Sequence, residues 1–259
     1  MKTTNQNEKN GKERMISSLD KALSAKEKAF FVAYILTIPW IFWLPLFYVA
    51  ALIRTYPSSP NFYGLWLSPK ILTVAYALSG MSLINHPHIL RERMQRSGVH
   101  GYKPGEPQRE KLAQNILLVS SLVMILISCY DAAGREVEVP GIAYAAGSTM
   151  IVISLILVSW VFRANSYGSK VVYKQEGQEL ITSGPYAFVR HPMYTFFTSF
   201  FLGMPLMLGS YYGIVPSLLV VLSLMWRTYH EEDFLMEEFD DRYRTYRSNV
   251  PWRMFPGIF

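Results

Sequence analysis

The chain has 259 residues, of which 51% are hydrophobic and 15% aromatic, and its mean hydropathy is positive although it carries a formal net charge of +6. This composition excludes an ordinary soluble domain of the same size. The only cysteine, Cys129, excludes an intrachain disulfide and a cysteine-based metal site. We therefore expect an integral membrane protein that holds no metal.

The chain divides into three parts. Residues 1–28 mix Asn, Glu, Lys and Ser without an apolar stripe and predict a flexible polar tail. Residues 29–162 contain four apolar runs and a polar loop, 85–112, and predict a membrane region. Residues 163–259 contain two further runs and most of the residues that suggest chemistry. The six runs are 30–53, 62–84, 113–130, 142–162, 193–208 and 213–226.

The apolar runs predict membrane-spanning helices. Several reach the roughly 20 residues that a helix needs to cross the hydrocarbon layer. Their nearly continuous apolar character excludes the alternating pattern of a barrel strand. The fold class predicted is all-α, a bundle of about six spans. Ser68, Pro69 and Lys70 interrupt the second run, which is either one kinked span or a re-entrant piece. Only residues 210–212 separate the last two runs, and this spacing predicts a tight helical hairpin.

The basic residues predict how the chain is oriented. Lys and Arg concentrate in the tail, in loop 85–112, in the loop after the fourth run and in the stretch after the sixth. The opposite loops contain only Arg54 and Arg135. Because short cytoplasmic loops retain basic residues, we expect both termini and the functional site in the cytoplasm, at the plasma membrane or the endoplasmic reticulum. The positive charge then follows from topology, and no nucleic-acid partner is predicted.

The junction before the fifth run predicts an anion site. Residues 170–173 and 179–182 suggest two short strands that lead into Arg190-His191-Pro192. Pro192 suits the first position of a helix, with His191 at its cap. Free N–H groups, the helix dipole and the Arg190 guanidinium together favour a bound carboxylate or phosphate. Alternatively, Arg190 and His191 only mark the membrane boundary and reach lipid phosphates.

The stretch after the sixth run predicts a cation site. Glu231 and Glu232 lie close to the membrane surface, where an acidic pair is unfavourable unless it serves a cation; the alternative is a solvated helix face. An apolar stripe at helical spacing follows, formed by Leu235, Phe239, Tyr243 and Tyr246. The hairpin brings both sites to one membrane face. A ligand that carries both a negative and a positive charge, such as S-adenosylmethionine, would match the two sites. Its adenine could stack on Tyr186 or Tyr194.

Three motifs in this region carry a family resemblance. Residues 180–194, LITSGPYAFVRHPMY, are followed by the Glu231-Glu232 pair and by residues 239–251, FDDRYRTYRSNVP. In this order they resemble the isoprenylcysteine carboxyl methyltransferase and phospholipid methyltransferase superfamily, over about residues 160–256.

The resemblance implies a membrane methyltransferase that takes S-adenosylmethionine from the cytosol and a lipid-like acceptor from the bilayer. It implies that Gln178 and Tyr186 belong to a loop that closes the pocket, and that Arg244 and Arg247 orient the substrate. The residues implied to enclose the cofactor are Arg190, His191, Pro192, Tyr194, Glu231 and Glu232. The chain departs from the family pattern at Gln178, where His is frequent, at Phe196, where Gly is frequent, and at residues 240–243, where Gly-Glu-Glu-Tyr is frequent.

The sequence does not decide which molecule accepts the methyl group. A prenylcysteine carboxylate is already ionised, and Arg247 would hold it; an ethanolamine phospholipid amine needs a base, for which Glu232 or His230 is available. Residues 250–259 together with the Arg-His-Pro motif also resemble the end of membrane sterol reductases, which use NADPH. A membrane binding or transport protein without enzymatic activity is a further alternative.

Overall fold

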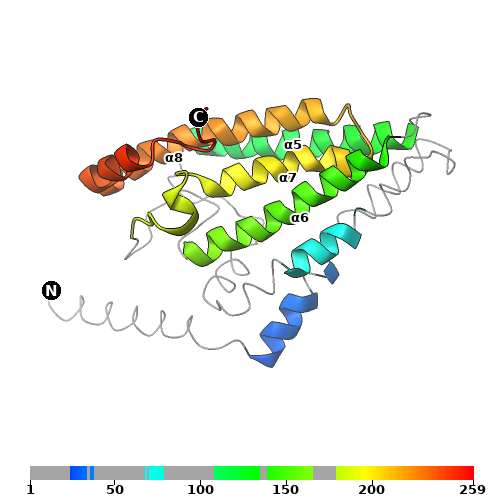
Figure 1. Ribbon diagram of the computed structural model, residues 1–259, viewed down its shortest axis with the longest axis horizontal. Coiled ribbons are helices and arrows are strands. Elements are labelled where there is room, and N and C mark those ends of the chain that lie inside the picture. Colours follow the sequence, from blue (N-terminus) through cyan, green and yellow to red (C-terminus); the bar gives the residue numbers. More distant parts are fainter. Residues whose placement is uncertain are drawn as a thin grey trace.

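A computed structural model describes residues 24–33, 36–37, 68, 70–78, 108–134, 139–165 and 179–259, and the regular structure within them is helical (Figure 1). Helical stretches cover residues 25–33 and 70–78. The labelled elements are α5 (Gln108–Gly134), α6 (Gly141–Ala164), the 3-10 helix η1 (Gly184–Ala187), α7 (Pro192–Leu208) and α8 (Ile214–Asn249). The prediction of an all-α fold is confirmed for this part of the chain. Most of the first two predicted spans lies outside the described residues.

The first described helix begins at residue 25, inside the predicted flexible tail 1–28. Its start is a capping box. The Ser24 hydroxyl accepts a hydrogen bond from the Glu27 backbone N–H at 3.2 Å, and the Ser24 backbone N–H donates to the Glu27 carboxylate at 2.9 Å. This reciprocal pair stabilises a first helical turn that composition alone did not reveal.

Helices α5 and α6 have the length and composition of membrane spans. Residues 112–133 and 141–164 each have a mean hydropathy of 2.1, and in α5 only 33% of the most apolar window is buried within the protein. The exposed side of α5 includes Leu118, Val119 and Leu122. A contiguous apolar surface of this kind is unfavourable in water, whereas lipid covers it without cost. The protein is therefore a membrane protein, and the number of six spans stays a prediction.

Helices α7 and α8 form the predicted tight hairpin. Gly209 ends α7 in the left-handed conformation (φ 77°) that favours glycine. In the turn, the Ser210 hydroxyl donates to the Asp131 carboxylate of α5 at 2.7 Å, and the Gly213 N–H donates to the Ser210 hydroxyl at 3.1 Å. These bonds fix the turn to the end of α5, which lies beside the hairpin in Figure 1.

Helix α7 packs closely on α6. A Cβ added at Gly203 would lie 2.8 Å from the Gly147 carbonyl oxygen, so the two glycines permit this approach of the backbones. Nearer the start of α7, the Ser154 hydroxyl donates to the Phe196 carbonyl at 2.6 Å. The Phe196 ring packs against Val158 and its neighbours on α6. Phe196, where the family often has Gly, is thus used in helix packing.

Helix α8 extends far beyond the sixth apolar run, and it bends at Asp240. This residue has φ 41° and ψ −116°, a conformation that only glycine adopts easily. After α8 ends, residues 250–259 run back along it, so that the C-terminus lies beside the middle of α8 (Figure 1). The Phe259 ring lies 5.8 Å from the Tyr229 ring. The bend and the return bring the C-terminal segment, residues 250–259, to the start of α7.

Candidate functional site

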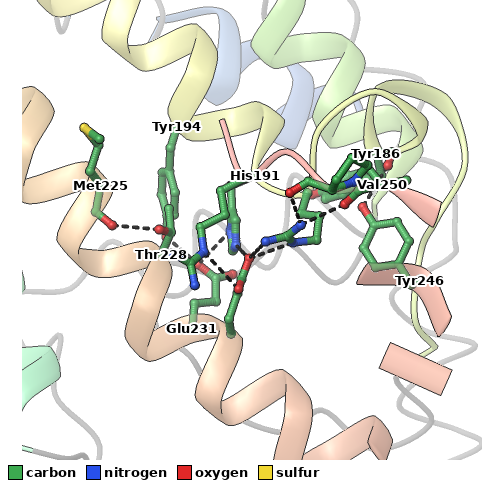
Figure 2. Close-up of polar contacts among 12 residues, drawn as sticks. Tyr186, His191, Tyr194, Met225, Thr228, Glu231, Tyr246 and Val250 are labelled. Atoms are coloured by element: carbon green, nitrogen blue, oxygen red, sulfur yellow. Dashed lines mark hydrogen bonds and ion pairs between the residues drawn. The ribbon is translucent and has the colours of Figure 1, made fainter. Parts of the chain in front are cut away.

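The centre of the site is the carboxylate of Glu232, whose side chain is only 4% exposed. Its Oε1 accepts hydrogen bonds from Nε and Nη2 of Arg190, both at 2.7 Å, and lies 3.3 Å from Nε2 of His191. Its Oε2 accepts from Nε of Arg253 at 3.0 Å. Figure 2 shows polar contacts between side chains such as His191, at the start of α7, and Glu231, on α8. One buried carboxylate therefore ties three separate parts of the chain together.

Four of the five N–H donors of Arg190 are used by partners within the protein. Beyond its two bonds to Glu232, its Nη1 donates to the carbonyl oxygens of Val250 and Pro251, each at 2.7 Å. The guanidinium is buried, and charge-assisted bonds of this length are strong. The sequence predicted an open anion site here; instead, the anion that Arg190 binds is the side chain of Glu232.

The backbone at the start of α7 is also paired. Pro192 occupies the first turn and His191 the cap, as predicted, without a side-chain cap bond. The N–H of Arg190 donates to the Trp252 carbonyl at 3.0 Å, and the N–H of His191 donates to the Arg253 carbonyl at 2.8 Å. The N–H groups of Arg190 and His191, which precede the first turn of α7, are therefore not free for a ligand, because the C-terminal segment supplies their acceptors.

Glu231 is the accessible carboxylate of the pair, with its side chain 27% exposed. Its Oε2 accepts a hydrogen bond from the Tyr194 hydroxyl at 2.7 Å and lies 3.7 Å from Nδ1 of His191. The rings of Tyr194 and His191 stack nearly parallel, with centroids 5.8 Å apart, and the Arg227 guanidinium lies 5.8 Å from the Tyr194 ring centroid. Tyr194 is thus buried in the network, where it orients Glu231.

The network sets the charge of Glu232, which lies beyond the predicted sixth span. Burial alone raises the pKa of this carboxyl. The hydrogen bonds and charges of His191 and Arg190 act in the opposite direction and lower the pKa to about 2. Glu232 is therefore ionised at neutral pH and binds protons weakly.

Tyr186 is held by two contacts on the other side of Arg190. The Tyr246 hydroxyl donates to the Tyr186 carbonyl at 2.7 Å, and the Asn165 amide donates to the Tyr186 hydroxyl at 2.9 Å. Residues 179–182, predicted as a short strand, have no regular structure, and the partner strand 170–173 lies outside the described residues. The predicted stripe on α8 is confirmed, because Tyr243 and Tyr246 pack with Leu235, Phe239 and Tyr186 in one apolar cluster.

Other residues implied by the resemblance lie elsewhere. Arg244 and Arg247 have exposed side chains, and Arg244 forms surface ion pairs with Asp240 and Asp241 at 3.3 and 3.7 Å. Neither arginine reaches the Glu232 network through a contact within the described residues. Gln178 lies outside the described residues.

Sequence reasoning missed two arginines of this region. Arg253 binds Glu232 and also covers the Tyr229 ring, 3.9 Å from its centroid; the sequence showed it only as one of the basic residues in the final stretch. Arg227 is buried beside Tyr194. Its position at the end of the sixth apolar run resembled that of a boundary residue, so no sequence signal distinguished it.

The buried polar atoms near the network that the described residues leave without a hydrogen bond include Nε2 of His230 and the hydroxyl of Tyr243. His230 precedes Glu231 directly, and its ring meets the Trp226 ring edge to face at 5.1 Å. Burial and the nearby Glu232 charge raise the pKa of Tyr243, so its hydroxyl stays protonated and available as a donor. Within the described residues, no group of three His, Cys, Asp or Glu side chains is arranged to hold a metal ion.

Parts of this chain are similar to known methyltransferases. Residues 142–242 match the phospholipid methyltransferase family. A stretch of 77 residues is 39% identical to protein-S-isoprenylcysteine O-methyltransferase of Schizosaccharomyces pombe, and it covers 28% of this chain and 31% of that protein. A solved structure of the eukaryotic intramembrane Ras methyltransferase, isoprenylcysteine carboxyl methyltransferase, aligns over 90% of this chain and 93% of its own at 16% identity. Its TM-score is 0.43, which does not establish a common arrangement of helices.

The fold and the site define a helical membrane protein with a buried ionic network where its last two helices meet the C-terminal segment. The match over residues 142–242 and the 77-residue similarity support the resemblance to the isoprenylcysteine carboxyl methyltransferase and phospholipid methyltransferase superfamily.

Proposed function

We propose that this protein is an integral membrane methyltransferase that uses S-adenosylmethionine and methylates a lipid-like or membrane-partitioning acceptor. The observation that carries the proposal is the Glu232 network. It joins the Arg190-His191 motif to the Glu231-Glu232 pair, and both lie in the region that matches the family.

The residues around Glu231 fit the donor. Its carboxylate is partly exposed and held by Tyr194, which suits an ammonium or sulfonium group. The unsatisfied His230 nitrogen and Tyr243 hydroxyl offer polar partners nearby, and the half-buried Tyr186 ring offers a stacking surface for a purine. When bound, S-adenosylmethionine supplies an activated methyl group that needs only an aligned nucleophile.

The paired residues of the network then act as positioning residues. Arg190 and Arg253 hold Glu232, and Glu232 together with Glu231 holds the His191 ring. This rigid arrangement fixes Tyr194 and Glu231 before a ligand arrives, which reduces the entropy lost on binding. Pro192 contributes by setting the first turn of α7.

The charge state of Glu232 favours a carboxylate acceptor. A carboxyl with a pKa of about 2 that already accepts several bonds is a weak general base. An isoprenylcysteine carboxylate needs no base, and the exposed guanidinium groups of Arg247 and Arg244 are suited to orient it. The name of the yeast relative supports this choice. An ethanolamine phospholipid, which the name of the matching family favours, would require His230 as the base.

The donor is tested by calorimetry with S-adenosylhomocysteine on the full chain in detergent. We expect the wild type to bind this product and Glu231→Gln to bind it at least about tenfold more weakly, the loss of one charged hydrogen-bond partner. Glu237→Gln is the matched control, because Glu237 is an exposed residue of the same helix, and it should bind like the wild type. If the protein binds NADPH and does not bind S-adenosylhomocysteine, the proposal is refuted and the sterol reductase alternative is favoured.

A further inference from the structure

A hollow lies between α6 and the helical stretch 70–78, away from the Glu232 network. It has a volume of about 420 Å³. Its lining residues are Lys70, Ile71, Val74, Ser148, Thr149, Val152 and Ile153. The back of stretch 70–78 is packed into the protein core, since Leu72 and Ala75 are buried with Ile151 and Met124. The hollow is thus a groove between two docked helices, and its open side, which includes the exposed Val74 and Ile153, faces outward.

Among the described residues that line this groove, Lys70 is the only one with a charged side chain. It lies within the second predicted span, where a charged group is unfavourable and is found mainly where it has a functional partner. The other polar side chains of the lining are those of Ser148 and Thr149, and neither hydroxyl can neutralise the charge of Lys70. The partner that fits is an anion that reaches this depth of the membrane.

The position of the groove separates it from the candidate methyl-transfer site. Thr149 lies 15 residues before Ala164, which is about 22 Å along α6 at 1.5 Å per residue. The hydrocarbon layer is about 30 Å thick, and Ala164 lies at the end of α6 nearest the network, where Asn165 binds Tyr186. Lys70 therefore lies in the half of the membrane remote from the Glu232 network.

The two ends of the groove differ in polarity. In the predicted topology, stretch 70–78 and α6 run in the same direction, toward the face that holds the network. Lys70, Ser148 and Thr149 then lie at the remote end, while Val74 and Val152 lie closer to the middle of the bilayer. This order matches an amphiphile whose head group faces the remote surface.

We propose that this groove binds an anionic phospholipid of the remote leaflet. The Lys70 ammonium and the Thr149 hydroxyl bind its phosphate, and an acyl chain lies along Val74, Val152 and Ile153. The bound lipid neutralises Lys70 and fills the space between stretch 70–78 and α6. This lipid is distinct from the methyl acceptor, because the acceptor has to reach the opposite face.

Native mass spectrometry of the full chain in detergent tests the proposal. The protein is titrated with phosphatidylglycerol and with phosphatidylcholine of the same acyl chains. We expect the wild type to retain phosphatidylglycerol about tenfold more tightly, as a charged hydrogen bond provides. Lys70→Gln should lose this preference, and Lys70→Arg should keep it. Arg163→Gln, which removes one positive charge at the other end of α6, is the matched control and should behave like the wild type.

A second variant distinguishes the effect of the Lys70 charge from the effect of the shape of the groove. Val74→Trp keeps Lys70 but fills the groove from an exposed position, and it should reduce the retention of phosphatidylglycerol. The proposal is refuted if Lys70→Gln keeps the preference of the wild type. It is also refuted if Val74→Trp blocks only a prenylcysteine analogue, because the groove would then hold the tail of the acceptor.

Discussion

Arg190 and Glu232 form a fully buried ion pair, with Nη2 and Oε1 2.7 Å apart and each side chain 4% exposed. They are 42 residues apart in the sequence, and they join the first residue before the α7 cap to the middle of α8. Arg253 donates to the same carboxylate, and Nη1 of Arg190 donates to the carbonyl oxygens of Val250 and Pro251. The pair is therefore both an ionic contact and the point that anchors the C-terminal segment.

Breaking this pair should destabilise the protein strongly. Arg190→Gln leaves the Glu232 charge buried with fewer partners, a change that typically costs about 3–5 kcal/mol. We expect a large fall in the apparent Tm in detergent at a fixed scan rate. Arg244→Gln removes an exposed ion pair and should change the Tm little. Equal effects of the two substitutions would contradict the structure.

Acid should weaken the network. The folded state lowers the pKa of Glu232 from 4.5 to about 2, so the ionised carboxylate stabilises folding above pH 4.5, and this contribution is lost as the pH falls toward 2. At about 1.4 kcal/mol per pKa unit, the contribution is on the order of 3 kcal/mol. The Tm difference between the wild type and Glu232→Gln should therefore shrink between pH 4.5 and pH 2. A difference that stays constant over this range would refute the assigned pKa.

Glycine should be preferred at the bend of α8. Asp240 has φ 41° and ψ −116°, and the related family often has Gly at this position. Asp240→Gly should raise the stability by roughly 1 kcal/mol, because backbone strain of this kind costs about 1–3 kcal/mol and glycine is more flexible when unfolded. Asp241→Gly, at the next position and within the helix, should lower the stability. Thermal unfolding of the two variants distinguishes them, and a lower Tm for Asp240→Gly would count against the bend.

The contact between α6 and α7 should tolerate no side chain at Gly203. A Cβ there would lie 2.8 Å from the Gly147 carbonyl oxygen and 2.9 Å from Cβ of Met150. Gly203→Ala should cost about 1–3 kcal/mol, as overpacking does. Gly141→Ala is the control, since a Cβ at Gly141 meets nothing within 4 Å. If both variants unfold at the temperature of the wild type, the helices are not packed as closely as described.

If Arg247 serves the methyl acceptor, its substitution should weaken acceptor binding and leave donor binding unchanged. Arg247 is exposed and makes no described contact with the network, so Arg247→Gln should leave the affinity for S-adenosylhomocysteine unchanged. If Arg247 orients an acceptor carboxylate, KM for a prenylcysteine analogue should rise about tenfold or more, as the loss of a charged hydrogen bond implies. Radiolabelled methyl transfer measures KM. An unchanged KM would remove Arg247 from the acceptor site.

The local features of this chain follow from its sequence. The apolar runs predict α5 and α6 because only a helix satisfies its own backbone in lipid. The three residues between the last runs predict the α7–α8 hairpin, and Pro192 predicts the start of α7. Each of these depends on a residue and its neighbours within one or two helical turns, which is the range that periodicity and capping report.

The network required the tertiary structure. Arg190 contacts carbonyl groups 60 and 61 residues away, and Arg253 reaches Glu232 only because the chain bends at Asp240 and returns along α8. The sequence identified Arg190 and Glu232 as opposite charges on one membrane face and assigned both to a ligand. Whether such charges bind a ligand or each other depends on the packing of α7, α8 and the C-terminal segment. No local sequence pattern encodes the distance between the Arg190 and Glu232 side chains.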